Sequence, residues 1–130
     1  MTAIKSFTNI PQSKKLAEIL PLESADMWYQ HTGFSIKDGS EKSLYFPMVI
    51  RDYKSDEDIP CWSLAALLDI IPKHIKDYNV LRIDISEKDF AIWYDEVGFG
   101  VNNDLPDITA DNPVDACYEF VLKLNELNLL

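Results

Sequence analysis

Acidic side chains are the residues of this sequence whose types and spacing most suggest chemistry. Asp95 and Glu96 follow a stretch with strand-like alternation, and Asp104, Asp107 and Asp111 occupy the polar segment after it. Paired carboxylates act as general acid and base when their surroundings separate their pKa values. Neighbouring residues of a strand point to opposite faces, however, so Asp95 and Glu96 do not form such a pair. We therefore expect a solvated acidic rim and assign no catalytic residue.

Metal, nucleophile and cofactor chemistry are not indicated either. Asp56, Glu57 and Asp58 are adjacent, but they lack the alternating aspartates and the later glutamate of a calcium-binding loop. His31 and His74 are the only histidines, and neither lies in a nucleophile motif, so we expect both at the surface. The four glycines form no phosphate-binding loop. We predict no metal, no cofactor and no enzymatic activity, while an unrecognised site remains open as an alternative.

The two cysteines and the absence of targeting signals suggest a location. Cys61 and Cys117 have no zinc-ligand spacing, and we expect two buried free thiols, because free cysteine packs as a small hydrophobe. No apolar run approaches the ~20 residues of a membrane-spanning helix. The first ten residues lack the basic and apolar regions of a signal peptide. We therefore expect a cytoplasmic protein that does not enter a membrane.

Charge is distributed unevenly along the chain. The formal net charge is −10, and residues 84–111 contribute −7 of it, from eight acidic residues against one lysine. Arg51 and Arg82 are the only arginines. Binding to a phosphate backbone needs a basic stripe, which this sequence lacks. Direct nucleic-acid binding is therefore not expected.

The aromatic residues are more suggestive of binding than the ionisable ones. Tryptophan and tyrosine anchor interfaces because they bury a large area and keep a polar group. Trp93 alternates with Phe90, Ile92 and Tyr94 on a predicted strand, so it is at least partly exposed if those three face the helices. The candidate interaction surface therefore consists of one tryptophan and the acidic rim: Trp93, Asp95, Glu96, Asp104, Asp107 and Asp111.

The elements that position these residues follow from periodicity and from capping residues. Helices are predicted within residues 12–20 with Ser13 as N-cap, over 64–71 after Ser63, and from Pro113 after the N-cap Asn112. Strands are predicted at 26–36, 44–50, 79–85 and 90–94, the last two as a hairpin with one face packed on helices. Pro47 lacks a ladder donor and is predicted to lie on an edge strand or at a bulge. Residues 52–58 and 98–110 are predicted as loops.

These elements predict an α+β fold in a single domain over residues 1–130. A small, largely antiparallel sheet of three to four strands would pack with about three helices. An α/β/α sandwich with helices on both faces is the alternative. The edge strand near Pro47 leaves room for a homo-oligomer that forms by extension of the sheet.

Three segments resemble, in the same order, small proteins of prophages and other mobile elements in gut Bacteroidetes. These are Ile59 to Pro72, Glu23 to Met27, and Asp111 to Ala116. The resemblance implies an origin but no activity, since that group has no assigned chemistry. A looser resemblance to phage helix–sheet–helix sandwich domains concerns the fold alone.

Three functions are consistent with this pattern. We favour a non-enzymatic accessory module of a phage or mobile element that binds an unidentified protein partner. The alternatives are an acidic mimic of nucleic acid that inhibits a basic protein, and a small enzyme with an unrecognised site.

Overall fold

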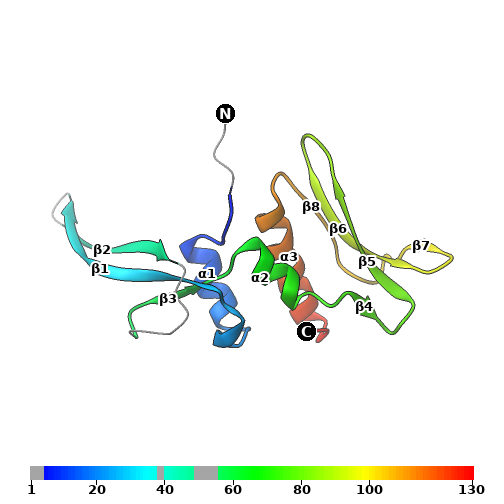
Figure 1. The fold of residues 1–130 in the computed structure, drawn as a ribbon, viewed down its shortest axis with the longest axis horizontal. Coiled ribbons are helices and arrows are strands. Elements are labelled where there is room, and N and C mark those ends of the chain that lie inside the picture. The colour runs from blue at the N-terminus through cyan, green and yellow to red at the C-terminus, as the bar shows by residue number, and fades with distance from the viewer. Residues whose placement is uncertain (1–4, 38–39, 49–55) are drawn as a thin grey trace. The chain divides into compact units, whose positions relative to one another are not determined.

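The computed structural model describes residues 5–37, 40–48 and 56–130 (Figure 1). Three α-helices and two antiparallel sheets are present in this part of the chain, which confirms the α+β class. Contacts divide the chain into two compact units, residues 7–63 and residues 64–130 with the segment up to Ser6. The single domain over residues 1–130 stays a prediction, and each unit is described by itself.

The unit of residues 7–63 begins with α1 (Ile10–Ala17) and a 3₁₀ turn (Leu22–Ser24). The predicted N-cap Ser13 is wrong, because Ser13 lies inside the helix and is buried. Asn9 caps the helix instead: its side chain accepts from the backbone N–H of Gln12, and the Gln12 side chain accepts from the N–H of Asn9. This reciprocal pair starts the helix earlier than the predicted residue 12.

The sheet of this unit has the strand order β2-β1-β3, in β1 (Met27–Lys37), β2 (Ser40–Met48) and β3 (Ile59–Cys61). Pro47 lies in β2, an edge strand, as predicted. Residues 49, 50 and 52–55 of the predicted strand and loop lie outside the described residues. β3 was not predicted, because three residues are too few to show a period of two. A buried cluster of Tyr29, Ile59 and Cys61 forms part of the core.

The unit of residues 64–130 contains a five-stranded sheet with the order β4-β5-β6-β7, in which β8 also pairs with β6. The strands are β4 (His74–Ile75), β5 (Asn79–Ile85), β6 (Phe90–Glu96), β7 (Gly100–Val101) and β8 (Asp107–Ala110). β5 and β6 form the predicted hairpin, with Ile85 opposite Phe90. The segment predicted as a long loop, 98–110, contains β7 and β8, so that prediction is wrong in part. These strands have two and four residues and leave no clear periodicity.

Two helices complete this unit, α2 (Leu64–Ile70) and α3 (Pro113–Glu126). Asn112 caps α3 as predicted, since its side chain accepts from the backbone N–H of Asp115. α3 packs against α2, β6 and β8 (Figure 1). The core of the unit is made of side chains from α2, the residue that follows it, β6 and α3: Leu67, Ile71, Ile92, Tyr94, Val114, Cys117, Phe120, Val121 and Leu124. No helix in the described part of the chain is long and apolar enough to cross a membrane.

Candidate interaction surface on the five-stranded sheet

The two sides of the five-stranded sheet differ in composition and in burial. Phe90, Ile92 and Tyr94 of β6 are buried on the side that α3 covers, and the Tyr94 ring contacts the Phe120 ring at 5.4 Å between centroids. The alternate residues of β6 and their cross-strand partners form the other side, which we name the open face. It carries Val80, Arg82, Asp84, Ala91, Trp93, Asp95, Val101, Asp107 and Thr109. These side chains are half-buried or exposed, so this side of the sheet is accessible to a partner.

Trp93 lies between Arg82 of β5 and Asp107 of β8 on the open face. It is half-buried, as its alternation with Ile92 and Tyr94 predicts. The indole Nε1 donates to Oδ1 of Asp95 at 2.7 Å, and Nε of Arg82 donates to the other carboxylate oxygen at 3.3 Å. Asp95 therefore fixes both neighbours and orients the indole, which reduces the side-chain entropy that binding would cost.

The residues predicted as one surface lie in three places. Trp93, Asp95 and Asp107 share the open face. Glu96 points to the opposite side and lines, with Asp104, a pocket of about 340 Å³ that also contains Tyr78 and Asn102. Asp111 is exposed before α3, where its carboxylate accepts from the side chain of Asn112 at 3.0 Å. Sequence spacing did not predict this separation, because β7 and β8 return the chain to β6 at different points.

A histidine pocket in the unit of residues 7–63 was missed by sequence reasoning. His31 was expected at the surface, but its side chain is only 9% exposed and its Nδ1 lies 3.0 Å from Oε2 of Glu57. Asp58 is buried and accepts from the backbone N–H of His31, and the Tyr45 ring packs edge-on against the imidazole. The pocket measures about 360 Å³ and is also lined by Lys14. His74, by contrast, is exposed as predicted.

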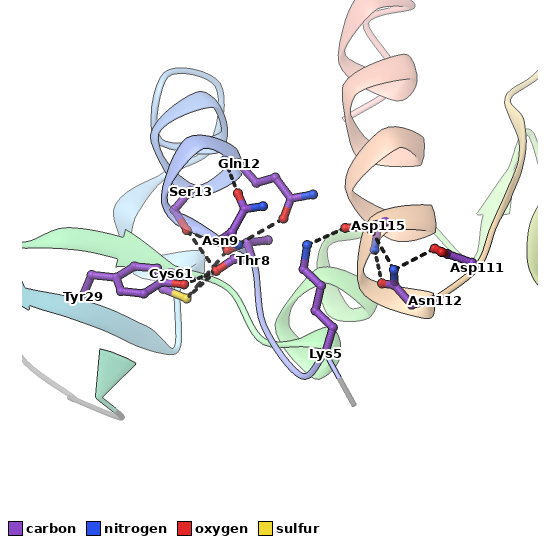
Figure 2. A network of polar contacts seen from close by, with 10 residues as sticks. All are labelled: Lys5, Thr8, Asn9, Gln12, Ser13, Tyr29, Cys61, Asp111, Asn112 and Asp115. Carbon is purple, nitrogen blue, oxygen red and sulfur yellow. Dashed lines mark hydrogen bonds and ion pairs between the residues drawn. The ribbon is translucent and has the colours of Figure 1, made fainter. Parts of the chain in front are cut away.

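Both cysteines are free and buried, as predicted. Cys61 lies in a polar network in which Thr8 is central: the Tyr29 hydroxyl donates to the Thr8 carbonyl at 2.6 Å, and Thr8 Oγ1 lies 2.8 Å from Ser13 Oγ (Figure 2). Burial raises the pKa of the Cys61 thiol and raises that of Cys117 to about 11. A protonated, buried thiol is a poor nucleophile, so this network holds α1 against β1 and β3 and does not resemble a reactive site.

A second set of polar contacts in Figure 2 belongs to the start of α3. Lys5 Nζ donates to Oδ1 of Asp115 at 2.6 Å, and the Asn112 side chain donates to Oδ2 of the same carboxylate at 2.6 Å. The negative charge of this carboxylate in the first turn of α3 also interacts favourably with the positive end of the helix dipole. These contacts stabilise the start of α3, and they explain the position of Asp115 without a functional role.

The ionisable groups of the described residues do not form a metal centre. No group of three histidine, cysteine or acidic side chains among them has the geometry to hold a metal ion. Asp56, Glu57 and Asp58 line the histidine pocket without forming a ligand set.

Comparisons with known proteins give no relative from which a role could be transferred. The chain matches no family model, no curated protein and no solved structure.

Proposed function

We propose that this chain is a non-enzymatic protein-interaction module that binds its partner with the open face of the five-stranded sheet. The observation that carries the proposal is the position of Trp93, half-buried on a sheet face whose other side packs against α3. Antiparallel sheets commonly keep one face in water, and on this face Asp95 already holds the tryptophan in one orientation. A partner that covered Trp93 would bury a large area while its N–H stayed bonded to Asp95.

The charges around Trp93 indicate the character of the partner. Asp84, Asp95 and Asp107 share the open face with one cation, Arg82, which already pairs with Asp95. A complementary partner would present basic side chains around an apolar pocket that takes the indole. The acidic mimic of nucleic acid is less well supported, because Glu96 and Asp104 lie away from this face and the acids form no continuous row. An origin in a phage or mobile element stays a proposal that only the resemblance suggests.

Affinity capture from a bacterial host lysate tests the proposal, with wild-type bait, Trp93→Ala bait and Phe99→Ala bait compared by mass spectrometry. Phe99 is the matched control, because it is an aromatic residue that is 83% exposed in the same unit. We expect a protein that wild type and Phe99→Ala retain and that Trp93→Ala loses. Removing a central tryptophan costs about 2 kcal/mol or more, which corresponds to roughly 30-fold in affinity.

Two outcomes would count against the proposed surface. A partner retained equally by all three baits would show that the open face is not the interface. A partner lost at high salt but retained by Trp93→Ala would favour the acidic mimic, since charge pairing weakens with ionic strength. If no bait captures a protein, the interaction function itself is wrong, and ligand screening of the two polar pockets replaces it.

A further inference from the structure

Among the described strands, none pairs with the second half of β5 on the side away from β6. β4 pairs only with Asn79 and Val80, and the N–H of Leu81 donates to the carbonyl of Lys73 at 2.9 Å. In an antiparallel pair, the N–H and C=O groups of successive residues point alternately toward the partner strand and away from it. The N–H and C=O groups of Ile83 and Ile85 therefore point away from β6, as those of Leu81 do. Within the part of the chain that the structure describes, β6 is the only strand that pairs with residues 82–85.

The side chains at this edge form an apolar row that ends in solvent. Ile83 lies opposite Ile92 and Ile85 lies opposite Phe90, on the side of the sheet that faces α3. Ile92 is fully buried and Phe90 is 5% exposed, but Ile83 is 41% and Ile85 is 74% exposed. Beside Ile85 is a notch of about 180 Å³, lined also by Leu64, Phe90 and Pro113. One more strand next to β5 would continue this row and bury it.

The charges on β5 alternate with the isoleucines and point to the open face. Asp84 and Arg82 are both exposed there. In a strand added beside β5, the residue opposite Asp84 would lie on the same face as its carboxylate. A basic side chain at that position is favoured and an acidic one is disfavoured.

From this edge we infer a binding site for an extended peptide segment of a partner protein, which adds as a strand beside residues 82–85. Two apolar residues of the segment lie opposite Ile83 and Ile85 and exchange main-chain hydrogen bonds with them. A lysine or arginine lies opposite Asp84, and an acidic residue lies opposite Arg82. Strand addition of this kind takes affinity from main-chain bonds and specificity from alternate side chains.

A second copy of this chain fits this edge less well than a foreign segment. Antiparallel pairing of residues 83–85 with themselves places Asp84 opposite the Asp84 of the second copy, which is unfavourable. The register with Ile83 opposite itself places Arg82 opposite Asp84, as required, but it also places Ile85 opposite Leu81, whose N–H already donates to the carbonyl of Lys73, so this pair lacks one main-chain hydrogen bond. A foreign segment with a basic residue therefore fits the edge better. This site does not rest on the binding of a partner at Trp93.

Two synthetic peptides of identical composition test the inference. The first, acetyl-Thr-Val-Lys-Val-Glu-Thr-amide, places lysine opposite Asp84 and glutamate opposite Arg82 in the antiparallel orientation. The second exchanges the lysine and the glutamate. Each is titrated into the ¹⁵N-labelled full chain, and binding is followed by two-dimensional NMR. A third version of the first peptide, N-methylated at the valine that faces Ile83, lacks one of the main-chain donors.

We expect the first peptide to shift the amide signals of Ile83 and Ile85 and to bind about tenfold more tightly than the exchanged peptide, because two favourable cross-strand pairs become two like-charge pairs. N-methylation should abolish binding. The protein variant Asp84→Lys, with its fold checked from the same spectra, should remove the preference between the first two peptides, because each peptide then makes one favourable pair and one like-charge pair with residues 82 and 84. Unmoved signals of Ile83 and Ile85, equal affinities, or unchanged binding after N-methylation would each overturn the inference. If the protein without peptide forms a dimer through residues 82–85, with twice the mass of the 14.9 kDa chain, the edge binds a second copy and the inference is overturned.

Discussion

Removal of the Tyr94 hydroxyl, a change of one oxygen atom, tests how the unit of residues 64–130 is stabilised. The Tyr94 side chain is fully buried, its ring packs on Phe120, and its hydroxyl donates to the carbonyl of Pro72 at 2.6 Å. The change Tyr94→Phe keeps the ring and its contacts and deletes only that donor. Pro72 is half-buried, so its carbonyl regains part of the lost bond from water.

The expected loss follows from these contacts. A typical intramolecular hydrogen bond contributes about 1 kcal/mol net, and a fully stranded acceptor costs more. Because the Pro72 carbonyl is only partly shielded, we expect the free energy of unfolding to fall by about 1 kcal/mol. For a unit of this size that corresponds to roughly 5 °C in Tm.

Urea unfolding at neutral pH, followed by circular dichroism and by tryptophan fluorescence, measures the change. Tyr78→Phe is the matched control, because the Tyr78 side chain is 48% exposed and its hydroxyl deletion should leave stability close to wild type. If Tyr94→Phe is as stable as wild type, or if Tyr78→Phe loses as much, the hydrogen bond to Pro72 does not contribute as argued and the reasoning is refuted.

Two further predictions concern the core and the pH dependence. Val121→Asp places an unpaired charge at a fully buried site of α3 and should unfold this unit. The control Leu127→Asp changes a residue that is 49% exposed, and this variant should stay folded. A cooperative urea transition for Val121→Asp would contradict the assignment of Val121 to the core. Burial raises the pKa of Tyr29 to about 12, from about 10 in the unfolded chain. Because the folded state then holds a proton that the unfolded state has lost, stability should be complete below about pH 10 and fall as the pH rises to about 12, by about 2–3 kcal/mol. Urea unfolding between about pH 10 and about pH 12 should show that the free energy of unfolding declines less in Tyr29→Phe than in wild type. An equal decline in both proteins would show that Tyr29 is not its cause.

Much of the fold could be predicted where the sequence repeats a pattern over seven or more residues. The hairpin of β5 and β6 has the predicted bounds at three of its four ends, and α3 begins at Pro113 as its cap indicates. The missed strands β3, β4, β7 and β8 have two to four residues each. Such strands form because a long neighbour offers free main-chain groups, as β6 does to β8, and their own sequence contains little of that information.

The candidate site was predictable in part for the same reason. Trp93 was placed on the less buried side of its strand because it alternates with Phe90, Ile92 and Tyr94 within one element. The histidine pocket was not predictable, because His31, Tyr45 and Glu57 come from separate segments and meet only through the pairing of β1 with β2 and the contact of Glu57 with His31. No spacing in the sequence encodes such a contact.

The disagreement between periodicity and burial at β5 is the most informative difference. Alternation predicts that Leu81, Ile83 and Ile85 face the helices just as Phe90, Ile92 and Tyr94 do, and the register confirms that the two rows share one side. Only the second row is buried, because α3 packs against β6 and β8 and leaves Ile83 and Ile85 exposed. The sequence pattern of β5 therefore predicts that these isoleucines are buried, but the described side chains of the same unit leave both exposed. In folded proteins the local sequence pattern normally agrees with the overall structure, and here it does not. Such disagreements are expected at functional sites, and among the residues that the structure describes only β6 pairs with Ile83 and Ile85, which is the reason that we propose an extended peptide as the missing layer.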